Sequence, residues 1–183
     1  RAIIEHLNVN QAYVTFYFEN EEVMSEGMYL DQKRDSTWVN YNQQGLTVSM
    51  EKFRKGKLNG KKLTFYLQNQ IERGEVKVLS ETHYKDSLKS GLYRELFSSG
   101  NVRLSGQYYL DNPSGVWRKF DMNGMCIQSF QYKNGLKHGW VINYNELQEI
   151  IHSELYKNGV LLKGKVKTAY LNECKLKGID PNE

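Results

Sequence analysis

Residues 104–124, LSGQYYLDNPSGVWRKFDMNG, decide the fold of this chain. Two short aromatic segments, at 105–110 and 116–120, lie on either side of the turn-forming run at 111–115. The Asn-Gly pair at 123–124 favours a tight hairpin turn. The stretch therefore predicts a strand, a turn, a second strand and a second turn. Because an isolated hairpin is only marginally stable in water, we expect it to pack against other hairpins.

The same unit recurs along the chain in phase. Aromatic residues equivalent to Tyr108 follow one another at intervals of 24, 31, 24, 24 and 24 residues, and they are Tyr29, Phe53, Tyr84, Tyr108, Tyr132 and Tyr156. The residues seven positions later are Ser36, Gly60, Gly91, Gly115, Gly139 and Lys163. Those twelve positions later are Tyr41, Phe65, Leu96, Phe120 and Tyr144, and those sixteen later are Gly45, Asn69, Gly100, Gly124 and Gln148. Such columns indicate a repeat protein.

Each column has a physical role in a stack of hairpins. Aromatic rings bury large areas and make cross-strand contacts, while a recurrent glycine permits a positive φ in a turn or a close approach of backbones. The pattern predicts an all-β fold, an elongated antiparallel meander or solenoid of β-hairpins of about 24 residues, with about a dozen strands. Trp38 and Tyr41 are three residues apart. Either aromatics line both faces of the sheet, or a bulge near the glycine returns them to one face.

The repeat array is expected to span residues 1–164, with an irregular first strand within 1–24. Seven extra residues within 66–80 predict a longer, projecting hairpin. Residues 165–183 are expected to form a C-terminal cap and tail. The sequence TAYLNECKLKG predicts a short helix capped by Thr168 and Gly178, with Leu171 and Cys174 facing inward. Residues 180–183 are expected to fray.

Composition limits the class of protein. The chain has 183 residues, a formal net charge of +4 and a mean hydropathy of −0.67, which suits a thin sheet with much wet surface. No apolar run approaches the roughly 20 residues of a membrane span. The sequence begins at Arg1 without a Met, which is consistent with a cleaved export signal, a lipid anchor or a shortened chain. Cys126 and Cys174 form no metal or redox motif; they are either two buried thiols, the commoner case, or one disulfide.

Residues that carry chemistry do not cluster in the sequence. The histidines His6, His83, His138 and His152 lack metal-ligand spacing, and no nucleophile, metalloprotease or phosphate-loop motif occurs. Acidic residues such as Glu51, Glu81 and Glu154 are scattered, and nothing selects a pair. We therefore expect no catalytic residue, no metal and no cofactor, and a protein that is not an enzyme.

Two sets of residues are candidates for binding. Exposed tryptophans could stack on a carbohydrate, and the candidates are Trp38, Trp117 and Trp140. Basic residues near one set of turns predict a basic rim, and its members include Lys33, Arg34, Lys57, Lys89 and Lys137. The rim is either a solubilising surface or a contact surface for an anionic membrane or another polyanion. A net charge of +4 is modest for a dedicated nucleic-acid binder, so no nucleic-acid partner is expected.

Three units, GMYLDQKRDSTWVNYNQQG at 27–45, GQYYLDNPSGVWRKFDMNG at 106–124 and FQYKNGLKHGWVINY at 130–144, resemble the MORN-repeat variant of bacterial proteins. The resemblance covers about residues 12–164, with Ser36 in place of a turn glycine and Lys62 in the tryptophan column. It implies a β-hairpin repeat scaffold that binds another protein, with antitoxin-like members. It also implies the bacterial cell envelope, periplasm or export rather than the cytoplasm. The resemblance implies no catalytic residue.

Overall fold

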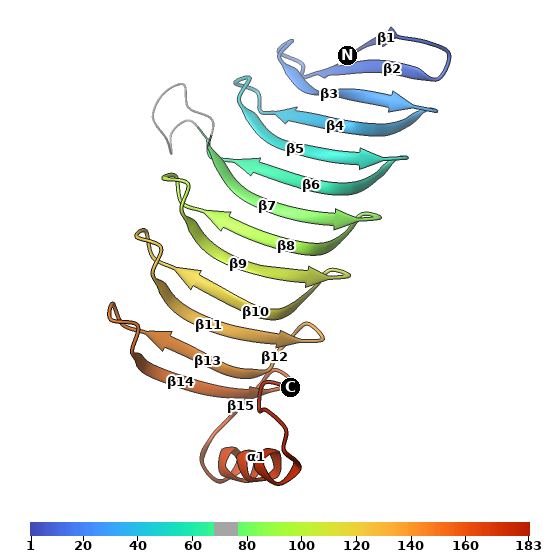
Figure 1. Cartoon of the computed structure of the whole chain (residues 1–183). Coiled ribbons are helices and arrows are strands. Elements are labelled where there is room, and N and C mark those ends of the chain that lie inside the picture. The colour runs from blue at the N-terminus through green and yellow to red at the C-terminus, as the bar shows by residue number, and fades with distance from the viewer. Residues whose placement is uncertain (68–76) are drawn as a thin grey trace. The chain divides into compact units, whose positions relative to one another are not determined.

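A computed structural model describes residues 1–67 and 77–183 of the chain (Figure 1). It forms two compact units, Arg1–Gly100 and Asn101–Glu183, a division that the repeat pattern does not predict. Each unit is an antiparallel meander in which successive strands pair. The described residues form fifteen strands and one C-terminal helix, which confirms the all-β hairpin-repeat fold.

In the first unit each strand pairs antiparallel with the next along the chain. The strands are β1 Ala2–His6, β2 Gln11–Tyr17, β3 Val23–Leu30, β4 Lys33–Tyr41, β5 Thr47–Arg54, β6 Lys57–Phe65, β7 Val78–Lys85 and β8 Leu88–Leu96. Most of the predicted insertion lies outside the described residues. At its base the backbone N–H of Tyr66 donates to the carbonyl of Lys77 at 2.9 Å.

The second unit continues the same pattern. Its strands are β9 Val102–Tyr109, β10 Asn112–Phe120, β11 Cys126–Lys133, β12 Leu136–Lys137, β13 Gly139–Tyr144, β14 Ile150–Lys157 and β15 Val160–Leu162. Both β12 and β13 pair with β11, so His138 interrupts what is one strand in the other repeats. The helix α1 spans Gly164–Lys177.

The hairpin turns that follow each anchor aromatic are shorter than predicted. The turn after Tyr108 consists of Leu110 and Asp111 alone, with φ of 47° and 66°, and β10 already begins at Asn112. Five other turns have two positive-φ residues, at 31–32, 55–56, 86–87, 134–135 and 158–159. Two consecutive positive φ values define the type I′ turn, whose twist matches that of the flanking strands. The prediction of a turn over 111–115 is therefore wrong.

In the five full repeats the column seven residues after the anchor marks a bulge in the second half of the hairpin, whereas Lys163 in the last partial repeat has a φ of −128° and is the N-cap of α1. Gly60 and Gly91 have φ of 118° and 105°, and the strand register shifts beside them. Ser36, which replaces glycine in the first full repeat, keeps a φ of 60°. The positive φ is confirmed, but the column lies in the strand and not in the turn.

The opposite loops repeat a second motif. In three of them a side-chain oxygen accepts two backbone N–H groups across the loop. Asn42 accepts from Gln44 and Leu46, Asp121 from Asn123 and Met125, and Asn145 from Leu147 and Glu149, all at 2.9–3.0 Å. Residues sixteen after the anchor hold the positive φ here, for example Gly45 at 74° and Gly124 at 85°. This column is thus the left-handed position of the loop.

Aromatic residues line both faces of the sheet. Trp38 pairs with Gly27 on β3, and its ring meets the ring of Tyr29 edge-on at 5.3 Å. Tyr41 instead donates a hydrogen bond to Glu26, the neighbour of Gly27, at 2.6 Å. Because adjacent residues of a strand point to opposite faces, Trp38 and Tyr41 lie on different faces. Of the two alternatives for the aromatic spacing, the two-faced one is correct.

Each unit has its own aromatic core. In the first unit Trp38 is fully buried and donates from its indole N–H to the carbonyl of Met28 at 3.0 Å. In the second unit Trp117 is 4% exposed, and the rings around it are those of Tyr108 at 5.3 Å, Tyr132 at 5.9 Å and Phe130 at 6.4 Å. The predicted packing role of the anchor aromatics thus holds around both tryptophans.

The C-terminal helix is longer than predicted. It begins at Gly164 with Lys163 as N-cap and no capping side-chain bond, so Thr168 lies inside the helix and is not its cap. Gly178 closes it in the left-handed conformation, and Cys174 is buried, both as predicted. Both cysteines are free thiols, although Cys126 is only half-buried. No helix of the described residues is long and apolar enough to span a bilayer.

The C-terminal tail is anchored, which contradicts the predicted fraying of residues 180–183. The side-chain oxygen of Asn182 accepts the backbone N–H of Trp140 at 3.1 Å, and its carbonyl accepts a bond from Gln131 at 2.7 Å. Asn182 lies so close to Gly139 that a Cβ there would meet its Cα at 2.9 Å. The absence of a side chain at Gly139 is therefore what admits the tail.

Candidate functional site

An apolar groove of about 480 Å³ lies over the first three strands. The side chains that line it alternate along β1 and β2, as expected for residues that share one face of a sheet. They include Ile4 from β1, Val14 and Phe16 from β2, and Tyr29 from β3. Because apolar side chains make up much of its lining, this groove is a candidate binding surface.

Apolar side chains on β1 and in the loop that follows it are exposed. Ile4 is 56% exposed, Leu7 58% and Val9 99%, and Val9 lies in the turn that joins β1 to β2. Every residue of β1 is exposed, and β1 pairs with β2 along one side. Apolar side chains gathered on a surface beside a groove are typical of contact sites for other proteins.

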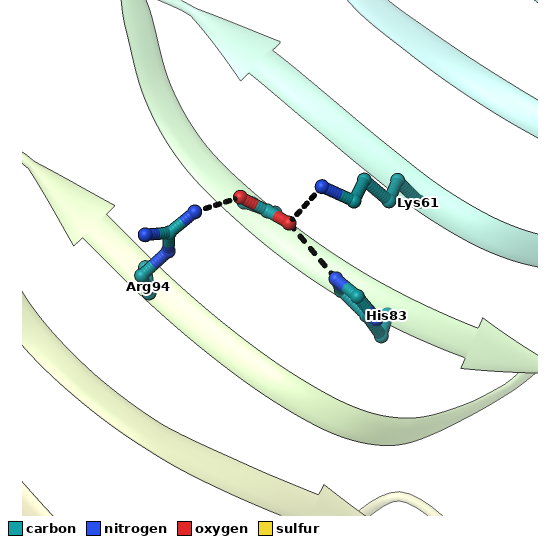
Figure 2. Close-up of polar contacts among 4 residues, drawn as sticks. Lys61, His83 and Arg94 are labelled. Carbon is teal, nitrogen blue, oxygen red and sulfur yellow. Dashed lines mark hydrogen bonds and ion pairs between the residues drawn. The ribbon is translucent and has the colours of Figure 1, made fainter.

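A buried carboxylate forms a second cluster, on β6, β7 and β8 (Figure 2). The side chain of Glu81 is 6% exposed, and three cationic or polar side chains point toward it. Lys61 lies 2.9 Å from Oε1, the His83 ring nitrogen 2.8 Å from the same oxygen, and Arg94 2.5 Å from Oε2. Both carboxylate oxygens are therefore occupied by donors from three strands.

This environment fixes the charge of Glu81. Burial by itself raises the pKa, but the hydrogen bonds from Arg94, Lys61 and His83 outweigh it and lower the pKa to about 2. A carboxylate that is ionised and already accepts three donors has little basicity left for proton transfer. The cluster therefore joins strands, and it lacks the properties of a general acid or base.

Another ion pair takes the place of a tryptophan in one repeat. Lys62, which the sequence places in the tryptophan column, lies 2.6 Å from Glu51, and Glu51 pairs across the sheet with Trp38. Sequence reasoning missed the Glu51–Lys62 pair and the bonds of Lys61 and Arg94 to Glu81, because the partners are 11 to 20 residues apart and only the strand register brings them together. The one local signal was Glu81-x-His83, whose spacing of two puts both side chains on one face.

The expectation of exposed tryptophans is wrong for two of the three residues. Trp38 and Trp117 are 0% and 4% exposed, so their rings cannot stack on a sugar. Trp140 follows Gly139 directly, whereas Trp117 follows Gly115 by two, so Val141 takes the buried place in the column. Trp140 is half-buried, and the ammonium of Lys167 from α1 lies 4.6 Å from its ring.

Several of the candidate basic residues contact other side chains of the fold. The guanidinium of Arg34 lies 4.1 Å from the Trp38 ring, and the ammonium of Lys137 lies 5.4 Å from the Tyr156 ring. Lys57 is 3.9 Å from Asp86, and Lys33 is exposed at the start of β4. Lys89 lies half-buried on β8. The structure brings these residues to hairpin ends without forming one cation cluster from them.

The described residues contain no group of three or more metal-ligating side chains placed to hold an ion. Neither a protein-family model nor a curated protein matches the chain.

Proposed function

We propose that the chain is a non-enzymatic repeat scaffold that binds another protein through the apolar groove over β1–β3. The observation that carries the proposal is that Ile4 and Val9, which line this groove, are exposed apolar side chains, and that Leu7 between them in the sequence is exposed as well. Elsewhere in the first unit the polar clusters are occupied by their own partners, as in the Glu81 network.

The chemistry of the groove favours an extended apolar segment as its occupant. Val14 and Phe16 of β2 line the groove together with Ile4 of β1, and every residue of β1 is exposed. A partner segment with alternating apolar residues can bury its side chains in the groove and pair its backbone with a strand. The resemblance to the MORN-repeat variant makes a toxin of a toxin–antitoxin pair the first partner to test.

The test places a photo-crosslinking amino acid at Val9 in the full chain and compares two backgrounds. We expect one partner protein to crosslink in the native background and to be lost with Ile4→Glu. The matched control is Ile151→Glu, because Ile151 is also an exposed strand isoleucine, at 64% exposure, in the second unit. The crosslinked protein is then purified and must bind the chain in a two-component assay.

Two outcomes would contradict this proposal. In one, Ile4→Glu leaves the affinity of the purified pair unchanged while the variant remains folded by circular dichroism. In the other, the crosslink disappears equally with Ile151→Glu, which would indicate a general effect of added charge. Turnover of a substrate by the purified chain would contradict the non-enzymatic part of the proposal.

A second candidate function is attachment to an anionic membrane surface. It is favoured by the exposure of Lys33 and Lys57 at hairpin ends. Vesicles that contain anionic lipid should then bind the chain at low salt and release it at high salt, since exposed charges are screened. Binding that survives high salt, or no binding at low salt, would rule this candidate out.

A further inference from the structure

The second unit contains a cavity of about 410 Å³ whose lining residues are mostly charged or polar. It lies at the turn between β11 and β12, the turn between β14 and β15, and the C-terminal helix. The side chains that matter for its chemistry are Lys133 and His138 from the first turn region, Lys157 from the second, and Tyr170 and Lys177 from α1. Neither the aromatic packing nor the groove in the first unit uses this cavity.

His138 is buried in the wall of this cavity. The residue is 6% exposed, and Nε2 has no hydrogen-bond partner among the described residues. Its Nδ1 accepts the backbone N–H of Asn158 at 3.3 Å, and the side-chain amide oxygen of the same residue lies 3.1 Å from Nδ1. We assign the ring proton to Nε2, because the backbone N–H of Asn158 donates to Nδ1, and we turn the Asn158 amide so that its nitrogen, and not its oxygen, faces Nδ1 as a second donor. The wall thus holds a buried N–H donor that lacks an acceptor.

Two lysines add positive charge to the same cavity. Lys133 and Lys157 both stand just before a two-residue turn, in equivalent places of consecutive repeats. Within the described residues neither ammonium has a carboxylate within ion-pair distance, and that of Lys157 lies 4.4 Å from the ring of Tyr170. The carboxylates of Glu173 and Glu183 also line the cavity, but Glu173 is held by Lys177 at 2.7 Å.

Position 138 is chemically distinct within the array. The equivalent residues of the other full repeats are Asp35, Asn59, Ser90 and Ser114, so the hairpin itself does not need a histidine. In this repeat the position faces the helix, and the strand breaks into β12 and β13 around it. The histidine is therefore specific to the cavity and not to the repeat.

We propose that this cavity binds a phosphate group, either as inorganic phosphate or as part of a small phosphorylated molecule. The ammonium groups of Lys133 and Lys157 would neutralise its charge, and the Nε2–H of His138 would donate to one of its oxygens. A compact oxyanion with several acceptor atoms matches two mobile cationic donors and one fixed N–H.

The proposal is tested by titrating the full chain with inorganic phosphate. Calorimetry measures the affinity, and nitrogen-15 NMR follows the ring of His138. We expect saturable binding, a shift of the Nε2 resonance of His138, and an affinity about tenfold weaker in Lys133→Gln and in Lys157→Gln. The matched control is Lys85→Gln, because Lys85 occupies the same repeat position in the first unit. Its phosphate affinity should equal that of the native chain.

Parallel titrations with acetate and with glycerol phosphate separate the sources of the anion. Tighter binding of glycerol phosphate than of inorganic phosphate would support a phosphorylated ligand, and equal affinity would support the free ion. Tighter binding of acetate than of both would overturn the assignment to phosphate. The proposal is also overturned if phosphate does not saturate, if Lys85→Gln weakens it as much as Lys133→Gln, or if the His138 resonance does not move. Ile4→Glu should leave phosphate affinity unchanged, so this result is independent of the proposed protein-binding groove.

Discussion

Each of the two buried tryptophans packs against a glycine on the preceding strand. Gly27 faces Trp38 across β3 and β4, and a Cβ at Gly27 would lie 2.6 Å from the indole ring. Gly106 faces Trp117 in the same way, and a Cβ there would also clash with the ring. Where the tryptophan is replaced by Lys62, the facing residue is Glu51, and the two form an ion pair. The glycine therefore makes room for the ring.

This pairing predicts a non-additive effect on stability. Gly27→Ala should lower the free energy of unfolding by about 1–3 kcal/mol, because the added methyl group overpacks the space held by Trp38. In a Trp38→Leu background the same change should cost clearly less, since the smaller side chain leaves room. Urea denaturation of the four proteins measures this coupling. An equal cost of Gly27→Ala in both backgrounds would show that the ring does not set the constraint.

The second tryptophan allows an independent prediction. Trp117→Ala should cost about 3–5 kcal/mol, as expected when a buried large side chain is removed. Tyr108→Ala should cost less, because Tyr108 is only half-buried although its ring contacts Trp117 at 5.3 Å. Thermal and urea unfolding of both variants decide the order. A larger loss for Tyr108→Ala would mean that the anchor tyrosine, and not the tryptophan, is the centre of this cluster.

At the scale of elements, strands β6, β7 and β8 are joined by the Glu81 network as well as by their backbone ladders. The folded pKa of Glu81 is about 2, below the ordinary value of 4.5. A carboxyl group with a depressed pKa stabilises the fold at pH values above its unfolded pKa, and this contribution is lost as the pH falls toward the folded pKa. The network should therefore weaken between about pH 4.5 and pH 2.

The matching variant is Glu81→Gln. At pH 7 it should be less stable than the native chain by about 1–3 kcal/mol, because the charge that binds Arg94 and Lys61 is lost. Near pH 2 the two proteins should converge, since protonated glutamic acid and glutamine are both neutral. Urea denaturation at pH 7, 4 and 2 measures the difference, and Glu19→Gln, at an exposed site, is the control. A stability difference that does not depend on pH would refute the assigned pKa.

At the scale of the whole molecule, the array repeats every 24 residues except at one place, where seven residues are added. Only one interval between anchor aromatics departs from 24 residues. A backbone hydrogen bond from Tyr66 to Lys77 already joins the ends of β6 and β7, on either side of the extra residues. Replacing residues 67–76 with the Gln-Gln-Gly of 43–45 would restore the interval of 24. We expect this change to leave the unfolding free energy within about ±0.5 kcal/mol. A loss of several kcal/mol would show that the extra residues support the sheet.

Much of this architecture follows from the sequence, because the recurrent glycines and aromatic residues mark positions that need a positive φ or a packed ring. The left-handed positions at Gly45 and Gly124 and the packed anchor Tyr108 were predictable from spacing alone. The position of Trp140 outside the buried column was also predictable, because Trp140 follows Gly139 directly whereas Trp117 follows Gly115 by two residues.

Other features depend on information that no local pattern carries. The Glu81 network and the cavity at His138 require the register of several strands, which bulges shift by one or two residues. The start of α1 was missed because Lys163 makes no side-chain cap bond. The two-residue turn at Leu110 and Asp111 was missed because neither is the glycine that such positions favour.

The central claim is that the tryptophan column is internal packing, so that a partner must bind elsewhere on the sheet. Acrylamide quenching of tryptophan fluorescence in Trp140→Phe tests it most directly, because only Trp38 and Trp117 then emit. The account predicts that both remain shielded from acrylamide in the folded chain and become accessible in urea. Quenching in the folded chain as strong as in urea would contradict it.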